Sequence, residues 1–327
     1  MKYLIIKIKY ICIIILILQC SKPPIKIISE NNPLETHRDI VLKVRFSPDD
    51  QLLASGGNDS DLILWDGRSG VFRKKLVGEF DKIFNIAFLE SKNEIVTGNY
   101  GGTLLTWNSQ KGIVKKEQLD QNFISDFDFY FPGKFFVVSS WDTSILVFKM
   151  EDHTILKKCK SSDYKIRTIK YSDKTKSVYA GTASGNLMRW SLEQCIEGEN
   201  YNSHIHNDAI TSIEVNDEME LLMTSSVDGQ IKLFNLHSLQ ETVMFNAHMA
   251  PVNIARFISP LFKVASGDKN GKIFIWDTRT LDYVILSAHT DSVNTLDISH
   301  DAKFIASGSS DRTVKIWSIQ KILSAPK

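Results

Sequence analysis

Near its C-terminus the chain reads Ser307-Gly308-Ser309-Ser310-Asp311 and then, after Arg312, Thr313-Val314-Lys315-Ile316-Trp317. A similar pair of segments begins at Ser55 and ends at Trp65. In both copies a polar turn that contains an aspartate separates two short runs rich in apolar residues. That pattern is typical of two β-strands joined by a tight turn. The stretch therefore predicts an antiparallel hairpin, and its recurrence predicts a repeat protein.

The aromatic residue that closes each hairpin recurs seven times along the chain. It is found at Trp65, Trp107, Phe148, Trp190, Phe234, Trp276 and Trp317, so successive copies are separated by 42, 41, 42, 44, 42 and 41 residues. Each unit contains three or four short apolar runs, and no long window has helical periodicity. Runs such as Ile273-Phe274-Ile275 are apolar at every position, which indicates strands buried on both faces. We therefore expect seven small sheets that stack against one another.

The composition is that of an ordinary globular protein. The 327 residues are 24 % charged and 43 % hydrophobic, which excludes a wholly disordered chain and a polytopic membrane protein. Lysine plus arginine is 39 and aspartate plus glutamate is 38, so the net charge of +1 gives no reason to expect a nucleic-acid partner. Four cysteines do not make a disulfide framework, and we expect Cys159 and Cys195 to be free thiols on the outer strands of successive units.

The repeats resemble the WD40 family. The Trp-Asp pair of that family is present at 65–66 and 276–277, and its Ala-His pair at 247–248 and 288–289. The resemblance implies an all-β, seven-bladed β-propeller of four-stranded antiparallel blades over residues 37–320, followed by a tail at 321–327. In that family one blade joins strands from both ends of the domain. The closing strand is expected from residues 24–29 or from residues 319–323.

A histidine, a hydroxyl residue and an aspartate or asparagine recur together in four units, in the manner of a hydrolytic triad. A catalytic triad occurs once per site, whereas this set recurs around a ring, so we interpret it as structural bracing. In the resembled family the tryptophan indole joins the same network. The predicted network comprises His37, Ser55, Asp59, Trp65, His206, Thr224, Asp228, His248, Ser266, Asn270, Trp276, His289, Ser307, Asp311 and Trp317.

No catalytic, cofactor or metal site is expected from the sequence. His204 and His206 are two residues apart and would share a strand face, but no carboxylate or cysteine has matching ligand spacing. Phosphate-cradling glycine motifs and nucleophile elbows are also absent from the sequence. The polar residues therefore predict a fold rather than a reaction.

The resemblance places the partner-binding surface on the top face, around the mouth of the central channel. Three positions per unit map to this face, and the first four units supply the large and the cationic side chains. These are Ile40, Leu42, Lys82, Phe84, Tyr100, Phe123, Trp141, Lys165 and Arg167. Aromatic anchors beside cations favour a protein or peptide partner, including an acidic one, on a monomeric propeller.

The N-terminal region has the pattern of an export signal. Lys2, Lys7 and Lys9 precede an uncharged run over 10–18, which is too short to cross a bilayer as a helix. Ile17-Leu18-Gln19-Cys20 resembles the lipobox of bacterial lipoproteins, although Gln19 replaces the small residue that the family prefers. The resemblance implies a signal peptide at 1–19, lipidation of Cys20 and a tether over 20–36. An uncleaved anchor is the alternative.

The sequence therefore predicts a non-enzymatic scaffold, tethered to a membrane of the bacterial cell envelope, that binds protein partners on its top face. One alternative is an enzyme or a sensor of a small ligand or sugar that uses the central channel. Another is an intracellular, cytoplasmic scaffold whose N-terminus is only an anchor. The top-face positions carry no Asp, Glu or His, which argues against the enzyme.

Overall fold

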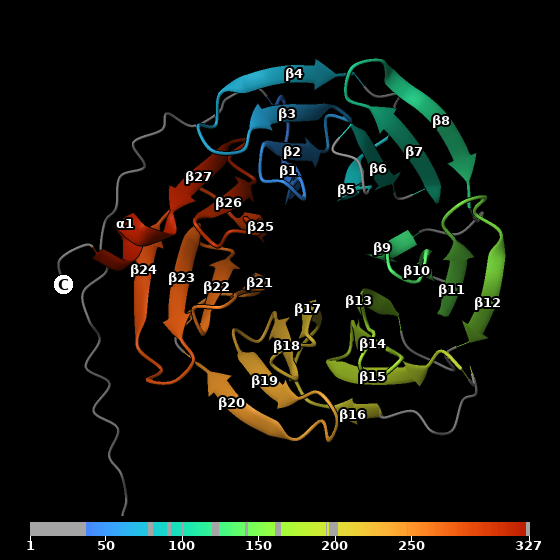
Figure 1. Cartoon of the computed structure of the whole chain (residues 1–327). Helices are drawn as coiled ribbons and strands as arrows, with labels where there is room; N and C mark the ends of the chain where they lie inside the picture. The colour runs from blue at the N-terminus through green and yellow to red at the C-terminus, as the bar shows by residue number, and fades with distance from the viewer. Residues whose placement is uncertain are drawn as a thin grey trace, which may run out of the picture.

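The computed structural model describes residues 37–77, 81–89, 93–99, 101–119, 124–140, 143–160, 165–193, 195, 202–246 and 248–324. These residues form seven antiparallel sheets arranged as blades around a central axis (Figure 1). Six sheets have four strands, and the seventh has three within the described residues. The predicted fold class, an all-β seven-bladed propeller, is confirmed.

Blades 1 to 4 each consist of four consecutive strands. Blade 1 holds β1 (Val41–Phe46), β2 (Leu52–Gly57), β3 (Leu62–Asp66) and β4 (Phe72–Leu76). Blade 2 holds β5 (Ile83–Phe88), β6 (Glu94–Asn99), β7 (Thr103–Asn108) and β8 (Gly112–Gln118). Blade 3 holds β9 (Ile124–Tyr130), β10 (Phe135–Ser140), β11 (Ser144–Lys149) and β12 (Ile155–Lys160). Blade 4 holds β13 (Ile166–Ser172), β14 (Ser177–Thr182), β15 (Asn186–Ser191) and β16 (Asn202–His204).

Blades 5 to 7 continue the ring back to blade 1. Blade 5 holds β17 (Ile210–Asn216), β18 (Leu221–Ser226), β19 (Ile231–Asn235) and β20 (Glu241–Phe245). Blade 6 holds β21 (Val252–Ile258), β22 (Lys263–Asp268), β23 (Lys272–Asp277) and β24 (Tyr283–Ser287). Blade 7 holds β25 (Val293–Ile298), β26 (Phe304–Ser309) and β27 (Val314–Ser318), and the helix α1 (Ile319–Ser324) follows it.

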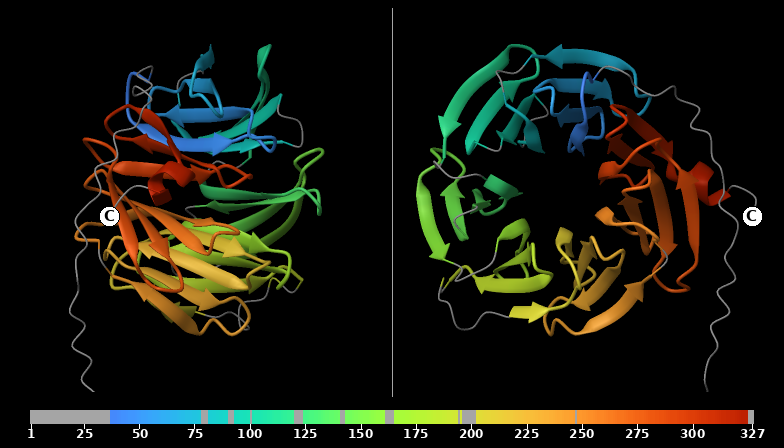
Figure 2. Two further views of the ribbon diagram at one scale, coloured as in Figure 1. Left: turned by 60° about the vertical axis from the view of Figure 1, so that its left-hand side comes forward. Right: turned by 180° about the vertical axis from the view of Figure 1, so that it is seen from behind.

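The first strand of each blade lies nearest the axis, and the fourth strand forms the rim (Figures 1 and 2). The two middle strands are packed on both faces by neighbouring blades, as their apolar sequences predict. Leu62 and Ile63 in β3 have no exposed surface. Glycines on second strands permit this contact: a Cβ on Gly56 would lie 2.5 Å from Ile83 Cγ2 of the next blade, so a larger residue would force the blades apart.

The two proposed sources of a closing strand have different outcomes. Residues 319–324 form the helix α1, so the alternative that placed the closing strand at 319–323 is wrong. The other segment, 24–29, lies outside the described residues, as do the predicted signal peptide, Cys20 and the tether. The helix α1 also spans the domain boundary predicted at residue 320. Among the described residues, no helix has the length and apolar character needed to cross a bilayer.

Candidate partner-binding face and central channel

The polar side chains predicted to brace blade 7 lie in contact. Trp317 Nε1 donates a hydrogen bond to Ser307 Oγ at 3.0 Å, and His289 Nε2 lies 2.7 Å from the same hydroxyl. Because an indole can only donate, the serine hydroxyl donates its own proton to His289 Nε2. The imidazole Nδ1–H then donates to Asp311 at 2.9 Å. This chain of bonds ties the segment before β25 to the turn between β26 and β27.

The same arrangement recurs in blades 1, 5 and 6. The histidine lies 2.7 Å from its hydroxyl in His37–Ser55, 2.8 Å in His206–Thr224 and 2.7 Å in His248–Ser266. The carboxylate lies 3.0 Å from the ring in His37–Asp59, His206–Asp228 and His248–Asp268. Trp65 and Trp276 donate to their serines at 2.8 Å. Phe234 closes blade 5, so Thr224 receives no indole bond there.

These groups have the hydrogen-bond pattern of a hydrolase triad, but a substrate cannot reach them. The four hydroxyl-bearing residues, Ser55, Thr224, Ser266 and Ser307, have no exposed surface. Burial lowers the pKa of the His206, His248 and His289 imidazoles, although the partner carboxylates oppose the shift. The rings are therefore neutral near pH 7, and no substrate reaches the hydroxyl groups. The arrangement can brace a blade, but it cannot present a nucleophile.

Asn270 is not the acid partner of His248, and that assignment is wrong. The residue that holds the imidazole is Asp268, at the end of β22. Its other carboxylate oxygen accepts the backbone N–H groups of Asn270 and Lys272, both at 2.9 Å. In blades 1, 5 and 7 the carboxylate comes four residues after the hydroxyl residue, whereas here it comes two residues after Ser266. An anionic carboxylate accepts stronger bonds than the neutral asparagine amide, which explains the shift in position.

Blades 3 and 4 are held together by different contacts. Val138 and Ala180 occupy the positions that correspond to Ser55, so these blades have no hydroxyl to link an indole to a histidine. In blade 3, Phe136 instead stacks on Phe148 with ring centroids 5.2 Å apart and on Phe129 at 4.9 Å. Aromatic packing therefore takes the place of polar bracing in blade 3.

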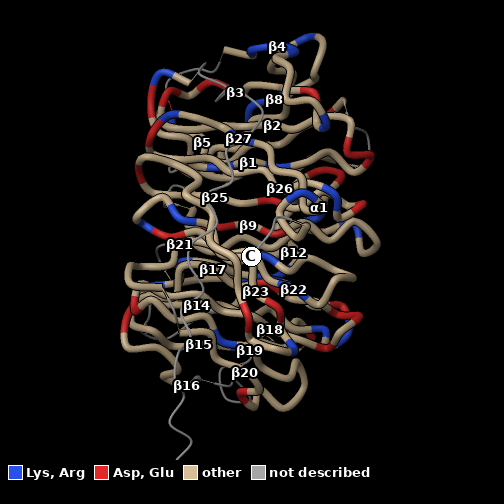
Figure 3. The backbone as a smooth tube through the Cα atoms, turned by 90° about the vertical axis from the view of Figure 1, so that its left-hand side faces the viewer, with Lys and Arg blue, Asp and Glu red and all other residues tan. Residues whose placement is uncertain are grey.

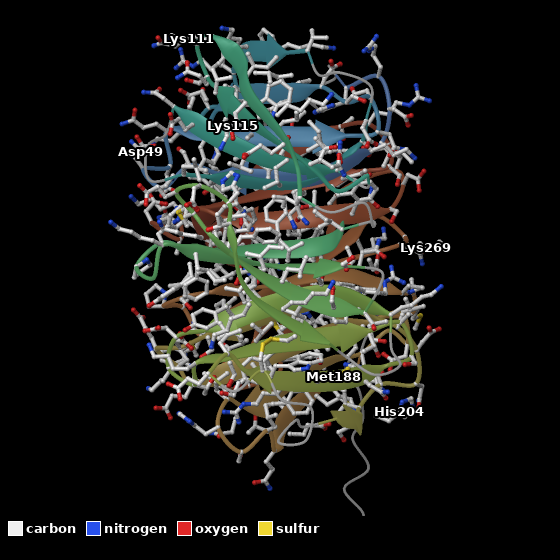
Figure 4. The ribbon with its side chains drawn as sticks, turned by 90° about the vertical axis from the view of Figure 1, so that its right-hand side faces the viewer. Asp49, Lys111, Lys115, Met188, His204 and Lys269 are labelled. Atoms are coloured by element: carbon white, nitrogen blue, oxygen red, sulfur yellow. A yellow bond between two sulfur atoms is a disulfide. The ribbon has the colours of Figure 1, made fainter. Side chains whose placement is uncertain are left out.

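The central channel is lined by the first strands of the seven blades. We call the face that carries the β22–β23 turn, with Lys269, the top face, and the opposite face, with Asp49, the bottom face (Figure 4). One position per blade forms a ring of side chains, here called the lower ring. Its members are Arg45, Ala87, Asp128, Lys170, Glu214, Arg256 and Asp297.

Three ion pairs join neighbouring members of the lower ring. Arg45 Nη1 lies 3.0 Å from Asp297, Lys170 Nζ lies 2.5 Å from Asp128, and Arg256 Nη1 lies 2.9 Å from Glu214. These pairs connect blade 1 to blade 7, blade 4 to blade 3, and blade 6 to blade 5. The lower ring therefore balances its own charges. Elsewhere, acidic and basic positions are interspersed along the side of the disc in Figure 3.

Acceptors from one blade also bind the backbone of the next. Each first strand has one edge without a strand partner, so its N–H groups need other acceptors. Asp297 Oδ2 accepts the N–H of Phe46 at 2.7 Å, and Asp128 Oδ2 accepts that of Tyr171 at 3.0 Å. Asp126, Ser212 and Thr295 accept the N–H groups of Ile169, Ala255 and Val44 at 3.1, 3.1 and 3.3 Å. The bonds all run in one direction around the ring.

Two cavities lie along the channel. The cavity toward the bottom face measures about 410 Å³ and the cavity toward the top face about 140 Å³. They share Arg45, Asn85, Phe127, Lys170 and Arg256 in their walls, so they form successive parts of one axial passage. The top cavity is the part nearest the predicted partner-binding face.

The structure brings three of the nine predicted top-face residues together. Leu42, Phe84 and Arg167 line the top cavity from blades 1, 2 and 4. Ile40, Lys82 and Lys165 each precede the first strand of a blade and do not line the cavity. The remaining three predicted residues, Tyr100, Phe123 and Trp141, lie outside the described residues.

The sequence did not lead us to the charged channel residues, because the candidate binding positions were taken from the turns and not from the middle of the first strands. A signal was present, because the lower-ring positions are separated by the same 42, 41, 42, 44, 42 and 41 residues as the closing aromatics. Opposite charges at one repeat position, on strands expected to line an axis, would have indicated paired ions between blades.

Cys159 and Cys195 form a disulfide, so the prediction of free thiols is wrong. Their Cα atoms are 5.1 Å apart, and the sulfur–sulfur bond is drawn in yellow in Figure 4. Cys159 lies on the outer strand β12 of blade 3, as expected. Cys195 follows β15 in blade 4 and does not lie on an outer strand, so it can reach across to the neighbouring blade. The bond links two consecutive blades near the rim.

The described part of the chain contains no group of three or more His, Cys, Asp or Glu side chains placed to hold a metal ion. His204 Nδ1 lies 3.1 Å from Asn186 Oδ1, and the neighbouring His206 belongs to the bracing of blade 5. The two histidines therefore have separate structural partners.

Comparisons with known proteins agree with the repeat pattern. The model of the "WD domain, G-beta repeat" family matches residues 29–66, 199–235 and 282–318. The chain is 23 % identical over 307 residues to a WD repeat-containing protein 26 homolog of Arabidopsis thaliana, covering 88 % of this chain and 50 % of that protein. It is 21 % identical over 301 residues to pre-mRNA-processing factor 19 of Oryza sativa subsp. japonica, covering 88 % and 56 %.

A human relative, echinoderm microtubule-associated protein-like 4, is 23 % identical over 316 residues, covering 88 % of this chain and 31 % of that protein. The aligned region thus covers 31 % to 56 % of the length of these three relatives. Propellers of this type are typical of protein-interaction scaffolds. The matched segments and the seven blades show that the chain carries WD40 repeats, and they support its assignment to the WD40 family.

Proposed function

We propose that the protein is a non-enzymatic scaffold, held at a membrane of the cell envelope, that binds a protein or peptide partner on its top face. The observation that carries the proposal is the mouth of the channel, where Leu42 and Phe84 lie beside Arg167 around one cavity. Apolar and aromatic side chains next to a cation form the kind of surface on which binding energy is concentrated. The recurring polar groups are buried and committed to bracing, which leaves the mouth as the accessible chemistry.

A disulfide supports the extracytoplasmic part of this proposal. Disulfides persist in oxidising compartments, including the periplasm and cell surfaces, and are rare in the cytoplasm. The Cys159–Cys195 bond therefore favours an exported chain over an intracellular scaffold. Trapping of free thiols by alkylation in intact cells, followed by peptide mass spectrometry, separates the two. An oxidised pair supports export, and two alkylated cysteines in vivo would favour the intracellular alternative.

The outer strands of blades 1 to 3 support a position close to a membrane. Exposed apolar side chains lie close to lysines in the sequence of these strands: Phe72 and Lys74 in β4, Val114 with Lys115 and Lys116 in β8, and Ile155 and Leu156 with Lys157 and Lys158 in β12. The outer strands β16, β20 and β24 of blades 4 to 6 contain no lysine or arginine. Apolar groups interleaved with cations suit an anionic headgroup layer.

The membrane tether is tested by labelling with palmitate. Wild-type protein is compared with Cys20→Ser in the native host, and both are fractionated into membrane and soluble pools. The proposal predicts label and membrane association for the wild type and the loss of both in the variant. An uncleaved anchor would leave the variant in the membrane pool, and its N-terminal peptide would begin before residue 20.

The binding face is tested by quantitative affinity capture with the full chain. Phe84→Ala and Arg167→Ala are compared with Phe262→Ala, a matched control on the β21–β22 turn, which lies on the bottom face. A specific partner should be depleted about ten-fold by the top-face variants and retained by the control, at unchanged thermal stability. Equal loss of capture in all three variants would contradict a top-face site.

A further inference from the structure

The top cavity has an excess of positive charge. Five cationic side chains line it, from three blades, against one carboxylate. The cations are Lys43, Arg45, Arg167, Lys170 and Arg256, and the carboxylate is that of Asp126. In a confined space with little water, such an imbalance creates a strong attraction for an anion.

Most of the other charges in this region are already committed. Arg45, Lys170 and Arg256 each form an ion pair in the lower ring, as described above. Asp126 accepts bonds from Asn85 Nδ2 and Thr168 Oγ1, both at 3.0 Å, as well as from the backbone of blade 4. The carboxylate of Asp126 is thus held against the wall and is not ion-paired within the described residues.

Two donors in the wall have unused capacity. Arg256 is only 6 % exposed, and its Nε–H has no hydrogen-bond partner. The ammonium group of the half-buried Lys43 makes no hydrogen bond or ion pair within the described residues. A buried donor without an acceptor is costly, so an acceptor delivered between these two groups would be bound favourably.

The protonation state of Lys43 is also consistent with an anion-binding role for this group. Burial, together with repulsion from Arg45, Arg256 and Lys170, lowers the pKa of this ammonium from 10.5 to about 8, and Asp126 opposes the shift. The group is still mostly charged at pH 7. An anion beside it would raise its pKa toward the ordinary value.

We propose that the top cavity is a binding site for a single carboxylate group, held by Lys43 Nζ and Arg256 Nε, with Arg167 at the entrance. The charge of the whole passage selects a monoanion, because five cations and four carboxylates line its two cavities. The cavity of about 140 Å³ has room for an acidic side chain but not for a folded segment.

The carboxylate is supplied by the partner that docks on the top face, through an acidic side chain or a chain terminus. This identification of the donor rests on the proposed function, whereas the site itself does not. Leu42 and Phe84 would contact the apolar part of the same peptide at the mouth of the channel. A free small carboxylate is the other source with the same chemistry.

The test uses the full-length protein and small defined probes. A capped peptide, acetyl-Ala-Glu-Ala-amide, is titrated by isothermal calorimetry and NMR, with the glutamine peptide as the uncharged control and acetate as the free carboxylate. The proposal predicts that the glutamate peptide binds about ten-fold or more tightly than the glutamine peptide. Lys43→Met should abolish that preference. Lys111→Met, which removes an exposed charge from the β7–β8 turn on the bottom face, should leave it unchanged (Figure 4).

The wild-type protein offers a second measurement that does not depend on the folding of a variant. NMR titration of the lysine side chains should give a low pKa for Lys43, and the pKa should rise when the glutamate peptide is added. Binding of both acetate and the peptide assigns the site to carboxylates in general, and binding of the peptide alone assigns it to the partner.

Two results would overturn the proposal. One is equal affinity for the glutamate and glutamine peptides, and the other is an unchanged Lys43 pKa at saturating peptide. Failure of the proposed function looks different, because Phe84→Ala would then capture its partners normally while acetate still bound at Lys43.

Discussion

The Asp297 carboxylate joins the last blade of the propeller to the first through the backbone of Phe46. Oδ2 accepts the Phe46 N–H at 2.7 Å, and Oδ1 lies 3.0 Å from Arg45 Nη1 of the same strand. Asp297 is only 6 % exposed, so both bonds are made in a region largely shielded from water. The closure of the ring therefore depends on a side chain as well as on any strand exchange at the rim.

Asp297→Ala should destabilise the ring at this junction. The substitution leaves a buried N–H without an acceptor and Arg45 without its partner, which costs about 2–4 kcal/mol. Urea unfolding followed by tryptophan fluorescence measures the change. Glu151→Gln is the control, because its surface ion pair with Lys149 contributes little. Equal unfolding midpoints for the two variants would show that this contact does not support closure.

The acid partner of His248 can be identified by substitution. Asp268→Ala should lower the free energy of unfolding by about 1–3 kcal/mol, because the buried imidazole loses its acceptor. Asn270→Ala should change it by less than about 0.5 kcal/mol, since the backbone N–H of residue 270 is retained. Chemical denaturation of both variants decides the assignment. The reverse order of effects would restore Asn270 to the network.

Stability should fall on mild acidification. Burial holds the pKa of His206, His248 and His289 below 6.5, whereas the unfolded chain binds these protons near that value. In the interval between the two pKa values the unfolded state binds more protons, so the stabilisation is complete above about pH 6.5 and is lost as the pH falls below it. The thermal midpoint should therefore drop between about pH 7.5 and about pH 5.5.

His289→Gln should reduce this pH dependence, although it also lowers the midpoint at neutral pH. The carboxyl groups of Asp59 and Asp228 titrate in a separate, more acidic interval, because the folded state holds their pKa values below the ordinary 3.8. A midpoint that stayed constant down to about pH 5.5 would mean that the histidines are protonated equally easily in both states.

The disulfide should contribute substantially to stability. It closes a loop with a sequence separation of 36 residues, for which chain entropy gives about 3–4 kcal/mol. The double variant Cys159→Ala/Cys195→Ala, or addition of a reductant, should lower the urea midpoint accordingly. Unfolding curves that coincide with and without reductant would contradict a structural role.

The sequence predicted the fold well because its signal is repeated. The closing aromatic marks each of the seven units, so the loss of Ser55-like residues at Val138 and Ala180 did not obscure the seven-fold count. Where one position had to be assigned in one unit, the sequence was weaker. Asp268 and Asn270 occupy the same turn region, and only coordinates show which one faces His248.

Contacts between blades could not be predicted from the sequence patterns of the turns. Cys159 and Cys195 belong to different units, and their approach depends on the path of the segment after β15, which has no local sequence signature. The cationic side chain of Lys43, which has no ion-pair partner within the described residues, could not be predicted for a similar reason. Its neighbours Arg45 and Arg256 are remote from one another in sequence and meet only when the ring is closed.

The covalent crosslink lies in the arc of the propeller that has no histidine bracing. Val138 and Ala180 interrupt the polar network in blades 3 and 4, and the same two blades are joined by Cys159 and Cys195. The disulfide thus adds a covalent link between two blades that lack this set of hydrogen bonds. A thioredoxin-like reductant that cleaves this bond would loosen this arc before any other. The stability of the propeller therefore depends on whether its surroundings are oxidising or reducing.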